Sequence, residues 1–296
     1  MTVRTAIVPV AGLGTRLLPI TAATPKELLP LGGKPVLHYI AEELGRVGVQ
    51  KIILVSSHQK QQIARYFQLN QALVDSLRES GKEDLLNSLW SQSPHMGIDF
   101  EVEIQHQQRG LGDAVLCGIP KKPQPVIVAL GDCVIGLGGK STLLQRMLDV
   151  YESQSADMVI AFEEVPQDRV HRYGIAQPTA TEQGQDVFRL EGIVEKPERS
   201  EAPSNLAVAA RYIFGFPIFN ELKNLPPGKN NEIQLTDAIQ NLLKFGAKAY
   251  GVRLSKGESR YDVGNINSYV ESFVQFALAD PELRESVLRS VPNKSP

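Results

Sequence analysis

Short apolar runs bounded by turn residues recur along the chain, and they are the clearest pattern in the sequence. Runs this short and this rich in β-branched residues predict buried strands, mostly parallel, in the interior of a sheet. The predicted strands are Ala6–Val10, Ile52–Val55, Val126–Leu130, Met158–Phe162 and Arg211–Phe214, with a further strand near Phe100–Gln105.

Between these runs, apolar residues recur at the spacing of one helical face. Helices are predicted over Val36–Val47 and Leu143–Tyr151, another from after Glu232 to about Phe245, and an amphipathic one over Asn267–Leu278. Strands that alternate with helices are typical of an α/β fold, so we expect a mixed, mostly parallel central sheet flanked by helices.

One segment interrupts this alternation. Gln71–Gln92 is charged and helical in pattern, and it lies between a helix and the next strand. We therefore expect a helical insertion at about residues 71–92 within a single domain, residues 1–280, followed by a C-terminal tail, residues 281–296.

Composition and charge narrow the class of protein. The 296 residues are 42% hydrophobic and 22% charged, with a formal net charge of −2, which argues against a nucleic-acid-binding protein. Cys117 and Cys133 lack metal-ligand spacing, and no apolar run reaches the length of a secretory signal or a membrane helix. These features predict a cytoplasmic protein without nucleic-acid or membrane partners.

A glycine loop directly follows the first predicted strand. Gly12 and Gly14 allow the backbone to approach a ligand, and Arg16 offers a planar cation for phosphate oxygens. A dinucleotide-binding dehydrogenase is the alternative, but Leu17 stands where the third glycine of its G-x-G-x-x-G motif belongs. Gly139-Lys140-Ser141 matches the end of the P-loop motif G-x-x-x-x-G-K-S, but Val134 stands where the first glycine of that motif belongs, so a P-loop is not predicted.

Thr24-Pro25-Lys26-Glu27-Leu28-Leu29-Pro30 follows, a loop framed by two prolines. The combination G-x-G-T-R-x-L-P and P-K-E-L-L-P resembles the sugar-nucleotide pyrophosphorylases, whose fold is a Rossmann-like nucleotidyltransferase α/β core. These enzymes activate a sugar 1-phosphate with a nucleoside triphosphate.

Several collinear stretches between Val3 and about Val274 are similar to the bacterial UTP–glucose-1-phosphate uridylyltransferases in particular. Three positions depart from that family's pattern: Asp113 stands where histidine is usual, Cys133 follows Gly131-Asp132, and Ala210 stands where glycine is frequent. The similar stretches are Gly81–Leu86, Gly110–Cys117, Glu163–Pro166, Tyr173–Ile175, Val194–Pro197, Ala202–Ala207, Glu232–Ile239 and Arg260–Gly264.

The resemblance implies a Mg²⁺ cofactor and a set of catalytic cations. Asp132 follows a buried strand, which would place its carboxylate at the ligand edge of the sheet, and the resemblance pairs it with Asp262 as metal ligands. Arg16 would face the β- and γ-phosphates, Lys26 the α-phosphate, and Lys196 the phosphate of the sugar.

The resemblance also implies the residues that hold the sugar and the nucleotide. Glu195 would accept hydrogen bonds from sugar hydroxyls, and Gly174 would allow backbone to approach the sugar ring. Taken without the resemblance, Glu195-Lys196-Pro197 is an ordinary surface turn. The nucleotide-binding residues would be Ala11, Gly12, Gly14, Thr15, Glu27, Gln105 and Gly110.

The expected activity is transfer of a uridylyl group from UTP to glucose 1-phosphate, giving UDP-glucose and pyrophosphate. Two alternatives within the family are an enzyme that uses dTTP or another sugar phosphate, and a weakly active regulatory homologue. The resemblance further implies a homo-oligomer, dimer or tetramer, with the insertion and the C-terminal helix as contact surfaces. The five histidines show no ligand spacing, and none is assigned to catalysis.

Overall fold

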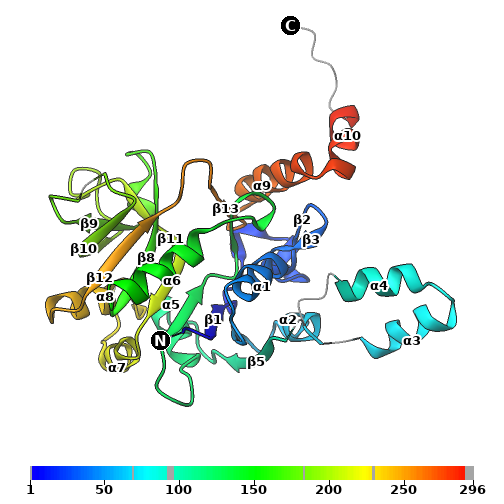
Figure 1. The fold of residues 1–296 in the computed structure, drawn as a ribbon, viewed down its shortest axis with the longest axis horizontal. Helices are drawn as coiled ribbons and strands as arrows, with labels where there is room; N and C mark the ends of the chain where they lie inside the picture. The colour runs from blue at the N-terminus through cyan, green and yellow to red at the C-terminus, as the bar shows by residue number, and fades with distance from the viewer. Residues whose placement is uncertain (1, 69, 92–96, 183, 229–230, 291–296) are drawn as a thin grey trace, which may run out of the picture.

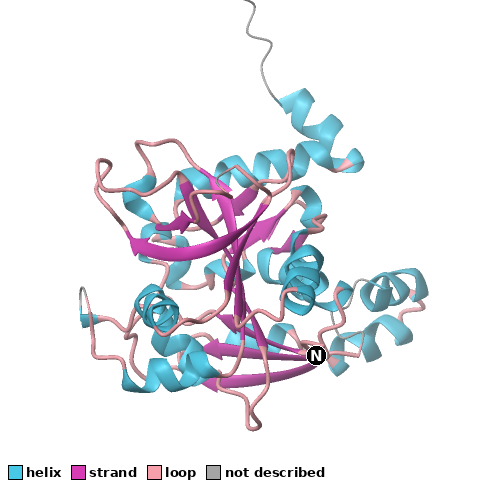
Figure 2. Ribbon diagram, turned by 60° about the vertical axis from the view of Figure 1, so that its left-hand side comes forward, coloured by secondary structure: helices cyan, strands magenta, loops and turns pink. Residues whose placement is uncertain are grey.

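The computed structural model describes residues 2–68, 70–91, 97–182, 184–228 and 231–290. Nine of the described strands form one twisted sheet that runs through the centre of the molecule (Figure 2). In sheet order they are β5 (Asp99–Ile104), β4 (Lys51–Ser56), β1 (Thr5–Pro9), β6 (Val126–Ala129), β11 (Leu206–Phe214), β8 (Met158–Glu164), β12 (Ala249–Arg253), β10 (Val187–Glu195) and β9 (Gly174–Pro178).

The sheet is mixed, and the expectation of a mostly parallel sheet is wrong. Of the eight neighbouring pairs in this order, β5–β4, β4–β1, β1–β6 and β8–β12 are parallel, and the other four are antiparallel. The first half follows strand–helix crossovers, which produce parallel pairs. By contrast, β9 and β10 follow each other without a helix between them, and such neighbours pair antiparallel.

Two layers of helices cover the sheet and bury a core on each face. On one face α1 (Val36–Arg46) and α6 (Leu143–Ser153) contribute to a core that includes Ala6 and Val8 of β1. On the other face α5 (Leu111–Cys117), α7 (Pro217–Asn224) and α8 (Leu235–Lys244) contribute to a core that includes Ile7. Alternate residues of one strand thus enter opposite cores, as the two-residue repeat of a strand requires.

The segment expected as a helical insertion contains two helices, α3 (Gln71–Glu79) and α4 (Glu83–Ser91), which follow α2 (Gln61–Tyr66). Figure 1 shows this arm projecting from the body of the protein beside α2. Residue 92, the expected end of the insertion, lies outside the described residues.

The C-terminal part is more ordered than a simple tail. The predicted amphipathic helix is α9 (Ile266–Ala279), and α10 (Pro281–Ser290) occupies the first ten residues of the expected tail and packs against α9. Residues 291–296 lie outside the described part of the chain. None of the described helices is both long and apolar enough to cross a bilayer.

A two-stranded ribbon joins distant parts of the chain next to the sheet. β7 (Cys133–Ile135) pairs antiparallel with β13 (Arg260–Asp262), and the short strands β2 (Pro30–Leu31) and β3 (Lys34–Pro35) form a second ribbon. Neither ribbon was predicted, because three-residue and two-residue strands carry too few residues for an alternation to be visible.

Candidate functional site

Two adjoining cavities lie beside the sheet. The first, about 340 Å³, opens beyond the carboxyl ends of parallel strands, where ligands bind in open α/β sheets, and lies between the loop after β1, the loop after β5 and the segment after β6. The second, about 270 Å³, lies over β9, β10 and β11. Both are lined by Leu111, Leu130 and Glu232, so the cavities are neighbours and together can hold two substrates side by side.

The glycine loop forms one wall of the first cavity. The amide of Val10 donates to the Val55 carbonyl at 2.8 Å, so β1 stays paired up to the loop, and Ala11 and Gly12 then line the cavity. Gly14 has φ +68°, and a Cβ there would lie 3.0 Å from the Thr21 methyl group, which explains why the loop needs glycine. Thr15, Arg16 and Leu17 follow in a 3₁₀ turn.

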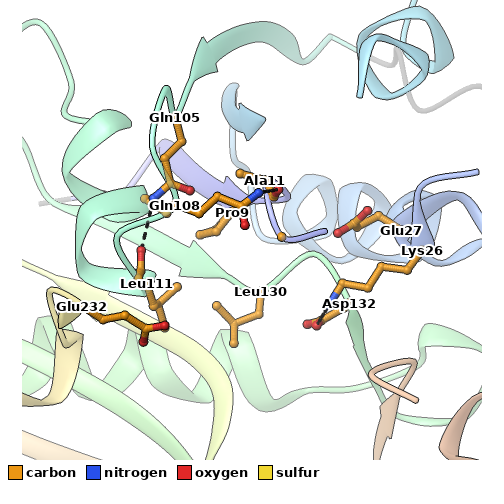
Figure 3. A pocket seen from close by; sticks show the side chains of 13 residues that line it. Pro9, Ala11, Lys26, Glu27, Gln105, Gln108, Leu111, Leu130, Asp132 and Glu232 are labelled. Carbon is orange, nitrogen blue, oxygen red and sulfur yellow. Dashed lines mark hydrogen bonds and ion pairs between the residues drawn. The ribbon is translucent and has the colours of Figure 1, made fainter. Parts of the chain in front are cut away.

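Lys26 and Asp132 meet at the mouth of the first cavity as a hydrogen-bonded ion pair (Figure 3). Burial alone would lower the pKa of Lys26, but the carboxylates of Asp132 and Glu27 raise it above its ordinary value. Burial would likewise raise the pKa of Asp132, but Lys26 holds it below its ordinary value. Both groups are therefore charged at neutral pH, and the pair offers a cation and an anion to an incoming ligand.

Asp262 lies beside Asp132, although 130 residues separate them in the chain. In the β7–β13 ribbon Asp262 is opposite Cys133, and the Val263 amide donates to the Asp132 carbonyl at 3.0 Å. Burial and the nearby Asp132 carboxylate raise the pKa of Asp262. The ribbon therefore places these two residues next to each other.

The donor set suits a hard divalent cation. No group of three or more histidine, cysteine or acidic residues in the described part of the chain could by itself hold a metal. However, Mg²⁺ is commonly held by one or two carboxylates, with substrate phosphates and water as its remaining ligands. Asp132 and Asp262 fit that arrangement, because both lie at the open edge of the sheet.

Glu27 is placed differently from its expected role in binding the nucleotide. It is 1% exposed, and its two carboxylate oxygens accept hydrogen bonds of 3.0 and 2.8 Å from the Lys60 ammonium. Lys60 also donates to the Val10 carbonyl at 2.7 Å. The Glu27–Lys60 pair therefore ties the Lys26 loop to the glycine loop, which fixes the distance between the two walls of the cavity.

Lys60 was not predicted from the sequence, because it stands in a polar run, Gln59–Gln62, that resembles any solvated loop. Gln108 was also missed. Its amide nitrogen donates to the Ala11 carbonyl at 2.9 Å and lines the first cavity (Figure 3). Polar residues of this kind have no periodicity that a sequence pattern could detect.

Gln105 and Gly110 form the deep end of the first cavity. Gln105 is buried, and its amide nitrogen donates to the carbonyl of Gly110 at 3.2 Å and to Asp113 at 2.8 Å. Gly110 has φ +96°, and a Cβ there would lie 2.9 Å from both Glu232 and the Ile233 carbonyl. Glycine is therefore required for the close approach of this loop to the segment before α8.

The second cavity contains Glu195 and Lys196 on one side. Side chains of adjacent residues in an extended strand point to opposite faces, but Lys196 has φ +47°, and the chain turns there. As a result the Lys196 ammonium lies 3.1 Å from a Glu195 oxygen, and Thr236 donates to the other oxygen at 3.1 Å. Both side chains can therefore serve one ligand.

Gly174 and Arg260 complete the second cavity. A Cβ at Gly174 would lie 3.0 Å from the Thr236 methyl group and 3.4 Å from Glu195, so the backbone there is accessible only without a side chain. The Arg260 guanidinium stacks 4.9 Å from the centre of the Tyr173 ring and pairs with Glu163. A role for Arg260 was not predicted from the sequence; within the stretch Arg260–Gly264, only Asp262 was assigned one.

The structure brings most of the predicted site residues together. Asp262 adjoins the first cavity, whereas Gly14, Thr15 and Arg16 lie on the loop beyond the residues that line it. Seven predicted residues line the first cavity (Ala11, Gly12, Lys26, Glu27, Gln105, Gly110 and Asp132) and three the second (Gly174, Glu195 and Lys196).

Comparison with known proteins connects this arrangement with a family. A family model described as nucleotidyl transferase matches residues 5–277. The UTP–glucose-1-phosphate uridylyltransferase of Staphylococcus epidermidis is 37% identical over 288 residues, which is 96% of each chain.

Two solved structures are similar over nearly the whole chain. A UTP-bound UGPase from Acinetobacter baumannii has a TM-score of 0.87 and 32% identity, covering 99% of this chain and all of the other. A UDP-glucose pyrophosphorylase complexed with UDP-glucose has a TM-score of 0.81 and 32% identity, covering 94% and 100%.

Proposed function

Because the chain belongs to the nucleotidyl transferase family, we propose that it transfers a uridylyl group from UTP to α-D-glucose 1-phosphate and releases pyrophosphate. The observation that carries this proposal is the pair of adjoining cavities, with the Lys26–Asp132 pair at the mouth of one and Lys196 in the other. Two anionic substrates placed there would meet between the lysines.

The first cavity suits the nucleotide. Uracil would lie against Ala11 and Gly12, with its donor and acceptor edge toward Gln105 and Gly110. The triphosphate would then extend toward Lys26, whose ammonium can pass from Asp132 to an oxygen of the α-phosphate. Arg16, on the exposed turn beyond the cavity, would close over the β- and γ-phosphates.

The second cavity suits the sugar phosphate. Lys196 would neutralise the phosphate, while the Glu195 carboxylate would accept hydrogen bonds from ring hydroxyls. The ring would approach the backbone at Gly174, where a side chain has no room. This orientation directs the phosphate of the sugar toward Leu111 and Leu130, the boundary shared with the first cavity.

The reaction needs positioning and charge neutralisation more than proton transfer. An oxygen of the sugar phosphate attacks the α-phosphorus of UTP, and the bond from that phosphorus to the oxygen bridging the β-phosphate breaks, with its electrons going to pyrophosphate. The attacking phosphate is already ionised, so no general base is required. Lys26 would stabilise the charge on the reacting phosphoryl group, and Arg16 the charge on the leaving pyrophosphate.

Asp132 and Asp262 would hold Mg²⁺, which supplies electrostatic neutralisation of the triphosphate oxygens. We therefore expect activity to disappear with excess chelator and to return with added Mg²⁺. The Asp132→Asn variant should lose activity while keeping its thermal unfolding midpoint, because an amide is a poorer ligand for a hard cation. Full activity in excess chelator would contradict the metal assignment.

A matrix of nucleotides and sugar phosphates, read out as released pyrophosphate, tests the proposed activity. We expect the highest kcat/KM with UTP and glucose 1-phosphate. A preference for dTTP, or for another sugar phosphate, would assign the chain to a different branch of the family. Absence of turnover with every pair would indicate a regulatory homologue.

A further inference from the structure

Asp113 is the departure from the family pattern with the clearest structural consequence. It lies in the first turn of α5, is 3% exposed, and makes two hydrogen bonds that use both of its carboxylate oxygens. Oδ2 accepts from the amide nitrogen of Gln105 at 2.8 Å, and Oδ1 accepts from the guanidinium of Arg109 at 2.6 Å. The sequence resemblance leads us to expect histidine at this position, but this chain places a carboxylate behind the amide of Gln105.

The hydrogen bonds of Gln105 determine which end of its amide faces the cavity. A glutamine amide has one accepting oxygen and one donating nitrogen, and the neighbours decide which atom points where. Here both neighbours of the nitrogen, the Asp113 carboxylate and the Gly110 carbonyl, only accept. The two hydrogens of the nitrogen are thereby used, and the oxygen accepts no hydrogen bond from the described residues.

If the Gln105 amide turned over, three oxygen atoms that only accept hydrogen bonds would face one another. The Gln105 oxygen would face both the Asp113 carboxylate and the Gly110 carbonyl, and the two acceptors would lose their donor. A neutral histidine carries one donor and one acceptor nitrogen, and would fix the amide in either orientation according to its tautomer. A carboxylate allows only one of these orientations.

We propose that Asp113 is a positioning residue that holds the amide of Gln105 with its oxygen toward the first cavity and thereby makes the site select the base. An accepting oxygen complements the imide N–H of uracil or thymine. Cytosine has an unprotonated ring nitrogen at that position, so two acceptors would face each other. This inference rests on the proposed function, because it assumes that a nucleoside triphosphate occupies the first cavity with its base against Gln105.

Asp113→Asn is the sharpest test, because it changes one acceptor into a donor at nearly constant shape. The Arg109 cation retains the remaining oxygen, so the new NH₂ group faces Gln105 and favours the turned amide, whereas the Gly110 carbonyl still favours the original orientation. We expect the ratio of kcat/KM for UTP to that for CTP, measured with glucose 1-phosphate, to fall roughly tenfold to a hundredfold. A ratio is insensitive to a general loss of active protein, which would lower both values equally.

Two further variants make the test decisive. Asp113→Ala removes the carboxylate but leaves the Gly110 carbonyl as an acceptor for Gln105. The ratio of kcat/KM for UTP to that for CTP should therefore fall by a smaller factor than in Asp113→Asn. If Asp113→Asn does not fold, Asp113→Ala provides the test. Arg109→Gln is the matched control, because it removes the cation that pairs with the other oxygen of Asp113. The Arg109 side chain is 53% exposed, so the UTP-to-CTP ratio of kcat/KM should stay within about threefold of the wild-type value.

The outcomes separate this inference from the proposed function. If wild type releases pyrophosphate from UTP and glucose 1-phosphate but the folded Asp113 variants keep the wild-type ratio, Asp113 has only a structural role and the inference is wrong. If wild type shows no turnover with any pair of nucleotide and sugar phosphate, the proposed function is wrong. The assumption that a nucleoside triphosphate occupies the first cavity is then wrong as well.

Discussion

Arg16, unlike the other predicted catalytic residues Lys26 and Lys196, lines neither cavity. Its side chain is exposed on the turn Thr15–Leu17 and makes no hydrogen bond or ion pair with the described residues. An arginine without an internal partner does not hold the fold together, so its removal should affect ligands more than stability.

Arg16→Ala should therefore lower kcat about a hundredfold, which corresponds to a loss of ~3 kcal/mol of transition-state stabilisation, because negative charge gathers on pyrophosphate as the bond breaks. The KM for UTP should change only a few-fold. Steady-state kinetics at varied UTP measures both parameters. Arg65→Ala removes an exposed arginine from α2 and serves as the control, with expected wild-type kinetics. A kcat within a few-fold of wild type would exclude Arg16 from catalysis.

Glu195 and Lys196 make different predictions, although they are adjacent and paired. Lys196→Ala should weaken all sugar 1-phosphates alike, since it removes a charge contact that they share. Glu195→Ala should weaken glucose 1-phosphate more than galactose 1-phosphate, roughly tenfold or more in kcat/KM, because the lost hydrogen bonds are those to particular hydroxyls.

Both sugar phosphates are measured at saturating UTP in each variant. Glu191→Ala, an exposed position on the same strand, is the control and should match wild type. Unchanged glucose kinetics in Glu195→Ala would mean that Glu195-Lys196-Pro197 is an ordinary surface turn.

At the scale of elements, a buried ion pair joins α1 to β11 beneath the site. Arg211 is fully buried, donates to both oxygens of Glu43, and also donates to the Cys133 carbonyl at 3.0 Å, next to Asp132. The register of β11 shifts between Val208 and Tyr212, and Ala210 there has φ +61°. This left-handed conformation favours glycine, although the chain has alanine there.

Glu43→Gln should destabilise the protein by about 3–5 kcal/mol, because the buried Arg211 charge would lose its compensating carboxylate. Glu42→Gln, one residue earlier on the same helix, is the matched control. Its partners are Lys34 and His38, and the Glu42 carboxylate itself is partly exposed, so the expected change is about 1 kcal/mol or less. Urea unfolding measures both. Equal small losses in the two variants would show that the buried pair contributes little.

At the scale of the whole molecule, α9 carries a stripe of exposed apolar side chains. Ile266, Val270 and Val274 are 47%, 50% and 40% exposed and lie four residues apart, so they share one face of the helix. The arm also exposes apolar residues, Leu73 on α3 and Leu85 on α4. These are the two surfaces expected from the sequence to mediate self-association.

We expect light scattering to give two or four times the subunit mass at micromolar concentration, and Val270→Asp to reduce it, because a charge would be buried in the contact. Leu73→Asp tests the arm in the same way. Phe245→Asp, at an exposed apolar residue on neither surface, should leave the mass unchanged. A wild-type monomer would refute the prediction of an oligomer.

The sequence by itself determined the elements whose pattern is local. The buried strands, the helices between them and the helical arm are visible because apolar spacing within ten or so residues decides what a segment can bury. The glycine loop was likewise predictable, since it follows a strand whose carboxyl end must lie at the ligand edge of the sheet, whereas the role expected of Lys26 came from the family resemblance.

The tertiary structure alone decided what depends on pairing between distant segments. Three of the four antiparallel pairs in the sheet, the closeness of Asp262 to Asp132, and the link from Lys60 to Glu27 join residues that are far apart in the chain. No local pattern encodes these contacts, because each partner has an ordinary sequence environment. Even the shared orientation of Glu195 and Lys196 depends on a left-handed backbone conformation that surrounding packing, rather than residue type, imposes.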